Sequence, residues 1–295
     1  GGGSIRLPAG LCGMVGLKPT FGRVSEDGAM EICWSLAHLG PIGATAADVA
    51  ACYALLAGED DKDSLTLCRP AVNLKDFGKD KLKGLRIGIE RAWFEDAEPD
   101  VVAGCYALIE HLTAAGAELK EISLPDVELA RAAQMVIIIT EMLAAAKRFD
   151  ADHRRDYGYD VQMNFALGRA FNGEDYAHAL RHRQGFTAQF LSCLQDVDVI
   201  VTPTTGGTAA PIPEHALPKG ESNLVVLERL SRFAAVGNLT GFPAIAVPAG
   251  YDRLGLPISC QFMGRPWEEA LLLRIARSAE RHISRVKPTL YFDLL

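Results

Sequence analysis

The first four residues, Gly1-Gly2-Gly3-Ser4, carry the most suggestive chemistry in the sequence. Glycines lack Cβ atoms, so their backbone N–H groups can approach a ligand closely and converge on one anion. A hydroxyl at the end of such a run can attack a carbonyl carbon while the N–H groups receive the negative charge that develops on its oxygen. The pattern predicts Ser4 as a nucleophile and Gly1, Gly2 and Gly3 as its oxyanion hole. The same four letters are typical of an engineered flexible linker, so the residues that follow must decide.

Other common catalytic and metal-binding signatures are missing from the sequence. It contains no G-x-S-x-G, H-E-x-x-H or phosphate-binding glycine motif. His178 and His182 stand four residues apart beside Arg181 and Arg183, a pattern typical of a solvated helix face. The 7 cysteines are odd in number and never in C-x-x-C spacing, which favours free thiols over a disulfide framework or a zinc site. We expect no metal, no cofactor and a reducing, intracellular compartment, with the organelle left open.

Composition excludes several classes of protein. The 295 residues are 49% hydrophobic and 23% charged, as in a globular chain with a sizeable core. The chain has a net charge of −7, so it lacks the excess of basic residues that drives nucleic-acid binding. The longest apolar stretch, 132–146, is interrupted by Glu141 and is too short to span a bilayer. We expect no transmembrane segment, whereas peripheral membrane contact stays open. The chain starts without Met and without a signal peptide, so a targeting segment further upstream cannot be read.

Glycine and proline positions, helix-capping residues and the periodicity of hydrophobic residues predict the elements that must position Ser4. The density of glycine and proline over 1–43 predicts tight loops over a sheet. Thr45 and Asp48 resemble a capping box that opens a helix, and Gly58 marks its end. A strand at 85–89, a helix from Pro99 to about 116 and a strand at 117–124 form a βαβ unit, which implies a parallel pair.

The second half of the chain alternates between helices and strands. Further helices are expected within 125–196, at 221–236 and at 267–283, and strands at 197–201, 244–247 and 257–263. This order predicts an α/β fold with a mixed, mostly parallel sheet covered by helices on both faces. We expect a single domain over 1–295, with a helical layer or subdomain at about 125–196.

The residues after Ser4 resemble the amidase signature, the stretch that identifies serine amidases. The resemblance begins with Gly2-Gly3-Ser4-Ile5-Arg6-Leu7-Pro8-Ala9, Gly16-Leu17-Lys18-Pro19-Thr20 and Gly22-Arg23-Val24-Ser25. It continues through Asp198 to Thr204, Asn238 to Ala244, Gly255 to Pro257 and Gln261 to Trp267, so nearly the whole chain is covered. Details around 197–208 and 264–268 look most like the plant-type fatty acid amide hydrolases of that family.

The resemblance implies specific roles and one gap. Ser4 matches the nucleophile of a Ser-Ser-Lys triad, and the glycines before it match the oxyanion hole. The family's general-base lysine and its second, cis-configured serine lie upstream of this motif, where the sequence has no residues, so the fold is expected to be incomplete at its N-terminus. Lys18 matches a structural Lys-Pro-Thr turn and is a poor substitute. Arg6 is expected to anchor a carboxylate of the missing loop, or else to form a plain surface salt bridge.

Substrate choice is weakly encoded. Met14 and Trp34 are candidates for lining an acyl-chain channel, together with Cys33, Met135, Ile138 and Met142; apolar residues at helical spacing are also typical of ordinary core. Thr202 and Thr204 follow a strand end, where open α/β sheets place ligands, and are candidates for the leaving-group side or members of a simple turn.

Three functions remain in competition. The leading hypothesis is a serine amidase that hydrolyses small-molecule fatty acid amides or N-acyl amines, provided that the missing lysine and serine are supplied. The second is the amidase subunit of a glutamine amidotransferase, which releases ammonia within a complex. The third is a non-catalytic, amidase-like subunit of a larger assembly. Homodimer formation or membership of a larger complex stays open.

Overall fold

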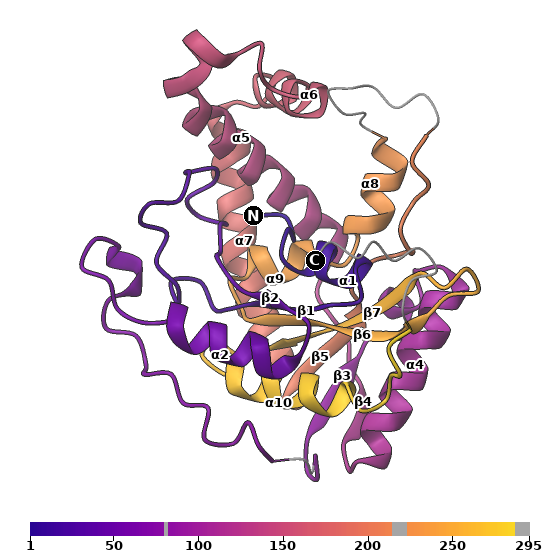
Figure 1. The fold of residues 1–295 in the computed structure, drawn as a ribbon. Helices are drawn as coiled ribbons and strands as arrows, with labels where there is room; N and C mark the ends of the chain where they lie inside the picture. The colour runs from indigo at the N-terminus through magenta and orange to yellow at the C-terminus, as the bar shows by residue number, and fades with distance from the viewer. Residues whose placement is uncertain (80–81, 214–222, 287–295) are drawn as a thin grey trace, which may run out of the picture.

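The computed structural model describes residues 1–79, 82–213 and 223–286, which build one seven-stranded sheet with helices around it (Figure 1). The strands are β1 (Val15–Lys18), β2 (Ile42–Gly43), β3 (Arg86–Ile89), β4 (Glu118–Glu121), β5 (Val199–Pro203), β6 (Ala244–Tyr251) and β7 (Pro257–Gly264). The helices are α1 (Arg6–Leu11), α2 (Ala46–Leu56), α3 (Arg91–Phe94), α4 (Pro99–Ala114), α5 (Val127–His153), α6 (Tyr159–Gly168), α7 (Gly173–Cys193), α8 (Leu224–Ser231), α9 (Ala235–Leu239) and α10 (Glu269–Ala279), with a short 3-10 turn at Ser64–Thr66.

The sheet is mixed, and its strand order is β2-β1-β6-β7-β5-β3-β4. β3 pairs in parallel with β4 and β5, as the βαβ unit predicts. The pairs β1–β2, β1–β6, β6–β7 and β5–β7 are antiparallel. The α/β class and the mixed sheet are confirmed, but the expectation of a mostly parallel sheet is wrong. Between β6 and β7 the chain has only the turn at 252–256, too short for the crossover that a parallel pair requires.

Helices cover the two faces of the sheet with different cores. In Figure 1, α2 and α10 lie below the sheet, while α5 and α9 lie above it. Side chains of α2, α4 and α10 pack with Val199, Val201, Ile245 and Phe262 in one apolar cluster. Side chains of α5, α7 and α9 pack with Ile200, Ala244 and Met263 in a second cluster. Since adjacent residues of a strand point to opposite faces, β5 contributes to both cores.

Most predicted helices begin where the sequence places them. At α2 the Thr45 hydroxyl accepts the Asp48 N–H at 3.1 Å and the Asp48 carboxylate accepts the Thr45 N–H at 3.1 Å, so the predicted capping box is confirmed. Residues 127–193 form the three helices α5, α6 and α7. The single helix expected at 221–236 is instead α8 followed by α9, with 221–222 lying outside the described residues.

Helix α1 was not expected from the sequence, because the glycine and proline density over 1–43 predicts loops. The helix tolerates Pro8 because Pro8 lies in the first turn, where a backbone N–H has no partner within the helix. The Cys12 N–H donates to the Pro8 carbonyl at 3.0 Å, and Gly13 ends the helix with a positive φ of 65°. The loop expectation is therefore wrong for residues 6–11.

Helix α5 is long and apolar enough to cross a membrane by length and composition alone, over Val127–Phe149 with a mean hydropathy of 1.5. Its contacts are those of a core helix, since Ala130, Ala133 and Ile137 are buried in the second cluster. Glu141, within the same stretch, is fully buried and hydrogen-bonded. Among the described helices no other reaches the same length and hydropathy.

Candidate active site

Ser4 lies in a turn that leads directly into α1, and its side chain is exposed. The Leu7 N–H donates to the Gly3 carbonyl at 2.9 Å, which closes this turn against the first residues of the helix. Gly3 has a φ of +119°, a conformation that L-residues with side chains rarely adopt. The turn therefore presents a serine hydroxyl to solvent on a backbone that only glycine supports.

The glycines before Ser4 are held in a tightly packed place. A Cβ on Gly3 would lie 2.6 Å from the Cβ of Ala234, and a Cβ on Gly1 would collide with the Cys33 sulfur and with Ile138. The Gly1 carbonyl accepts a hydrogen bond from the Gln134 amide at 3.2 Å. Close packing of this kind fixes backbone N–H groups in place, as an oxyanion hole requires. Donation by Gly1, Gly2 and Gly3 to a bound oxyanion stays a prediction.

Helix α1 is seated on the sheet through small residues. A Cβ on Gly10 would lie 3.0 Å from the Ser259 Cβ, and a Cβ on Gly16 would lie 2.6 Å from the Ala9 Cβ. Glycine at Gly10 and Gly16 thus permits a closer approach of α1 to β1 and β7 than any other residue would. The N-terminal end of α1, and Ser4 with it, is positioned against the rigid centre of the sheet.

Arg6 joins this helix to the rest of the site from inside the protein. It is 0% exposed, and its guanidinium donates to Gln261 Oε1 at 2.6 Å, Asn238 Oδ1 at 2.6 Å and the Ala234 carbonyl at 2.7 Å. Burial lowers the pKa of Arg6 from 12.5 to about 10. The surface salt bridge considered for Arg6 is therefore wrong. No carboxylate binds Arg6 among the described residues, so anchoring of a carboxylate in the upstream loop stays a prediction.

A closely packed pocket beside Ser4, with no room for a water molecule, brings together buried basic groups. It is lined by Gly1, Gly3, Ser4, Ile5, Arg6, Lys18, His38 and Asn238. Lys18 is 1% exposed, and its ammonium donates to the Pro19 carbonyl at 2.8 Å. Burial, followed by the neighbouring Arg6, holds the pKa of Lys18 well below its ordinary value. Lys18 makes no hydrogen bond to Ser4 among the described residues, which agrees with its expected structural role.

His38 and Asn238 belong to this pocket and were not among the predicted site residues. His38 Nδ1 lies 2.9 Å from the Leu36 carbonyl, which can only accept, so this nitrogen carries the proton. His38 Nε2 is buried without a hydrogen-bond partner within the described part of the chain. Burial, then the charge of Lys18, holds the pKa of His38 well below 6.5. The sequence offered one signal for Asn238, its place in the Asn238-Leu239-Thr240-Gly241 motif, and none for His38.

The weaker substrate candidates do not line the Ser4 pocket. Thr202 and Thr204 are 1% and 0% exposed, and their hydroxyls bond inside the protein to the Pro203 carbonyl and the Ser259 hydroxyl. Met14 follows the far end of α1, about 9 Å of helix from Ser4. Trp34 is 41% exposed. The proposed channel residues Cys33 and Ile138 do lie beside the glycine turn, against Gly1.

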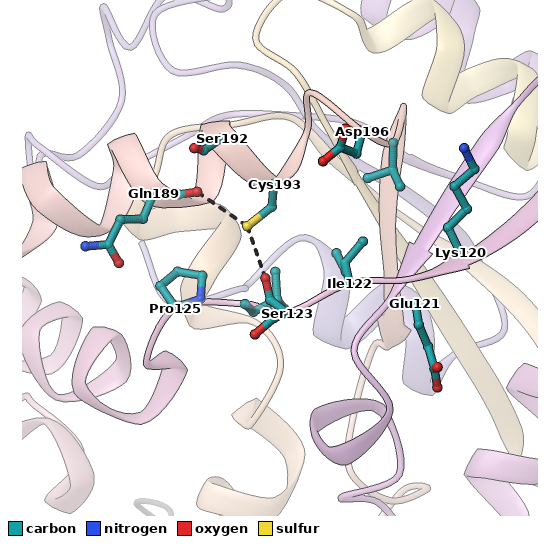
Figure 2. Close-up of a pocket in the computed structure, with 11 residues that line it drawn as sticks. Lys120, Glu121, Ile122, Ser123, Pro125, Gln189, Ser192, Cys193 and Asp196 are labelled. Atoms are coloured by element: carbon teal, nitrogen blue, oxygen red, sulfur yellow. Dashed lines mark hydrogen bonds between the residues drawn. The ribbon is translucent and has the colours of Figure 1, made fainter.

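Two larger pockets lie away from Ser4. One is an open pocket of about 490 Å³ between β4 and the end of α7. Figure 2 shows its lining residues, among which the Cys193 thiol donates to the Ser123 and Gln189 carbonyls. The other, of about 730 Å³, lies after β5 and is lined by Glu98, Arg229 and Asp252 among others. Neither pocket contains a predicted site residue. His178 is at the surface, 3.5 Å from Glu174, and residues 1–79, 82–213 and 223–286 hold no cluster of three or more metal-ligating side chains.

Comparison with known families and curated proteins gives consistent matches. Residues 1–273 match the family model described as Amidase. The fatty acid amide hydrolase of Arabidopsis thaliana is 38% identical over 304 residues, covering 100% of this chain and 50% of that protein. A subunit of the glutamyl-tRNA(Gln) amidotransferase of Synechococcus sp. is 34% identical over 306 residues, covering 95% of this chain and 62% of that protein. The chain spans about half the length of the fatty acid amide hydrolases that it matches.

Solved structures with the same fold include subunits of complexes. The corresponding glutamyl-tRNA(Gln) amidotransferase subunit of Thermotoga maritima has a TM-score of 0.81 and 30% identity, covering 95% of this chain and 60% of that one. A structure described as a vestigial protein complex, bearing on the origins of an s-triazine catabolic enzyme, has a TM-score of 0.85 and 28% identity, with 97% and 62% covered.

Proposed function

Because this chain belongs to the amidase family, we propose that it carries the serine nucleophile of an amide hydrolase, with Ser4 as the attacking group. The observation that carries the proposal is the exposed Ser4 hydroxyl on a glycine turn that is packed against Cys33, Ile138 and Ala234. A rigid turn of this kind can hold both the nucleophile and the backbone donors for the oxyanion without reorganisation during the reaction.

In the proposed reaction the Ser4 oxygen forms a bond to the amide carbon, and the carbonyl electrons move to the oxygen, which the glycine N–H groups stabilise. Collapse of this intermediate breaks the C–N bond, and the amine leaves with a proton. Water then attacks the acyl-serine and releases the acid. The base that takes the Ser4 proton is assigned to the family's upstream lysine and second serine, because Lys18 is buried and committed to the Pro19 carbonyl.

The substrate class that we propose is a fatty acid amide or N-acyl amine. Similarity to the plant fatty acid amide hydrolases over the whole chain supports this class. The apolar side chains of Ile138 and Cys33, which lie against Gly1, are suited to an acyl chain. Hydrolysis should therefore increase with acyl length when the native protein is given saturated primary amides of increasing chain length, and preference for short amides would contradict the assignment.

The nucleophile is tested by treating the native protein with a fluorophosphonate probe and mapping the adduct by mass spectrometry. We expect labelling at Ser4, and loss of labelling and of amide hydrolysis by at least about 10⁴-fold in Ser4→Ala. Because the Ser4 side chain is exposed, this variant should unfold at the wild-type denaturant concentration. Folded wild-type protein that neither labels nor hydrolyses amides would favour a non-catalytic subunit.

The second candidate is the amidase subunit of a glutamine amidotransferase, which the similarity to the Synechococcus and Thermotoga proteins supports. Release of ammonia from glutamine, with no hydrolysis of long-chain amides, would favour it.

We further propose a reducing compartment, because all seven cysteines are free and three of them, Cys33, Cys105 and Cys260, are buried. Alkylation of the denatured native protein without reductant should modify all seven.

A further inference from the structure

Glu141 is a buried carboxylate inside the long apolar stretch of α5. It is 0% exposed in the middle of α5. One of its oxygens accepts the Ser35 backbone N–H at 3.0 Å, and the other accepts the Ser35 hydroxyl at 2.6 Å and the Tyr176 hydroxyl at 2.8 Å. Burying a carboxylate costs free energy unless its oxygens are hydrogen-bonded, and these three hydrogen bonds offset that cost for Glu141.

Ser35 is bound through every polar group that it has. Its N–H and hydroxyl donate to Glu141 of α5, and its carbonyl accepts from Arg183 Nη2 of α7 at 2.9 Å. Arg183 Nε also donates to the Leu239 carbonyl of α9 at 2.7 Å. Burial and the bond to Glu141 raise the pKa of Tyr176 to about 12, so its phenol stays protonated and keeps donating. Residue 35 is thereby held between two helices that pack against each other.

The segment fixed in this way, residues 33–38, borders the Ser4 site at both of its ends. At one end, the Cys33 sulfur packs where a side chain on Gly1 would lie. At the other end, His38 lines the Ser4 pocket beside Asn238. Backbone bonds tie the two ends together, since the Cys33 carbonyl accepts the Leu36 and Ala37 N–H groups at 3.2 and 2.8 Å. The Leu36 carbonyl in turn accepts hydrogen bonds from His38 Nδ1 at 2.9 Å and from Asn238 Nδ2 at 3.3 Å. Displacement of Ser35 would therefore move both borders together.

We propose that Glu141 is a positioning residue that acts through Ser35 to hold residues 33–38 as the wall of the Ser4 site. The kinetic consequence rests on the proposed function, whereas the effect on the position of Cys33 does not. Glu141 does not touch the reacting atoms in this role; it keeps Cys33 against Gly1 and thereby keeps the glycine turn in the geometry needed for oxyanion stabilisation.

The first test measures the accessibility of Cys33 in the folded native protein. Cys33, Cys105 and Cys260 are each 0% exposed, so all three should resist alkylation by iodoacetamide in the wild type. In Glu141→Gln we expect Cys33 to react at least about tenfold faster, because charge-assisted bonds to Ser35 are lost, while Cys105 and Cys260 stay protected. The matched control is Thr140→Val, which removes a neighbouring buried hydroxyl that has no partner among the described residues and should leave all three rates unchanged.

Ser35→Ala is a second variant that leaves the buried Glu141 carboxylate unchanged. It removes only the hydrogen bond from the Ser35 hydroxyl to Glu141. We expect a smaller rise in Cys33 reactivity than in Glu141→Gln. Unchanged Cys33 protection in both variants would overturn the proposal, as would equal exposure of all three cysteines, which would indicate loss of the fold rather than local release.

The second test measures hydrolysis of a long-chain amide. A positioning role predicts that Glu141→Gln lowers kcat by about tenfold or more, because the oxyanion contact is made only in the transition state. KM for the long-chain amide should rise as well, because Cys33 is proposed to contact the acyl chain. A fall in thermal stability with kcat unchanged would overturn the positioning role. If the wild-type protein hydrolyses no amide and takes no fluorophosphonate, the proposed function fails, and the Cys33 measurement still decides whether Glu141 holds residues 33–38.

Discussion

The two faces of the sheet differ in what they bury. Towards α2, α4 and α10, strands β5, β6 and β7 present Val199, Val201, Ile245, Val247, Cys260 and Phe262. Towards α1 and α9 the alternating positions include the apolar Ile200, Ala244 and Met263, but also four buried polar residues: Thr202, Thr204, Ser259 and Gln261. Arg6 lies on this second face and bonds to Gln261, while Thr204 bonds to Ser259. Polar contacts therefore concentrate beneath the helix that follows Ser4.

The apolar face mainly stabilises the fold, whereas the polar contacts of the other face position the residues around Ser4. Apolar contacts are favourable and non-directional, so the first face contributes burial without specifying one orientation. Hydrogen bonds require particular distances and angles, and unmade bonds are costly inside a protein. The second face uses them to fix α1, residues 33–38 and Asn238 relative to one another. Loss of a polar contact there should affect Ser4, whereas loss of an apolar contact on the first face should affect only stability.

The strongest challenge to this comparison is Arg6→Ala. The variant leaves oxygen atoms of Gln261, Asn238 and Ala234 without their buried donor, which we expect to cost about 3–5 kcal/mol of unfolding free energy. Under conditions where the protein stays folded, fluorophosphonate labelling of Ser4 should also slow. Urea denaturation and labelling rates measure the two effects, and Arg6→Lys should lose less of both. Slower labelling without destabilisation would contradict the account of Arg6 as a buried anchor.

A matched substitution on the apolar face is Leu108→Ala in α4. Leu108 is 0% exposed within the first cluster, and truncation of such a side chain is expected to cost about 3 kcal/mol through lost burial and a cavity. Labelling of Ser4 in the folded fraction should remain at the wild-type rate. If this variant slows labelling as much as Arg6→Ala, the proposed separation between the two faces is wrong.

The smallest effect is the pH dependence that His38 confers. Its pKa is lowered in the folded protein by burial and by Lys18, so below about 6.5 the unfolded chain binds a proton that the folded chain resists. Stability contributed by neutral His38 is thus present above 6.5 and lost as the pH falls towards the folded pKa, by at most about 1.4 kcal/mol per pH unit. Denaturation at pH 7.5 and 5.5 should show a smaller loss for His38→Gln than for the wild type, and equal losses would exclude His38 as the cause.

Local signals in the sequence predicted elements well where a helix or strand depends on its own residues. The Thr45 cap and the β3–α4–β4 unit both lie where expected. Helix α1 was missed because Gly10 and Pro8 argue against a helix locally, while packing on Ser259 and Gly16 favours one. β6 and β7 are antiparallel because a turn of only five residues connects them, and the hydrophobic pattern of a strand does not indicate its direction relative to its neighbour.

The sequence by itself determined the family: a glycine run ending in Ser4, followed by residues that resemble the amidase signature, identifies the amidase family and makes Ser4 the candidate nucleophile. Only the tertiary structure decided what surrounds that serine. Arg6 and Glu141 are buried and bonded through contacts made across more than 100 residues, Arg6 with Gln261 and Glu141 with Ser35. Residue type fixes which bonds a side chain can make, whereas burial determines which of them it must make.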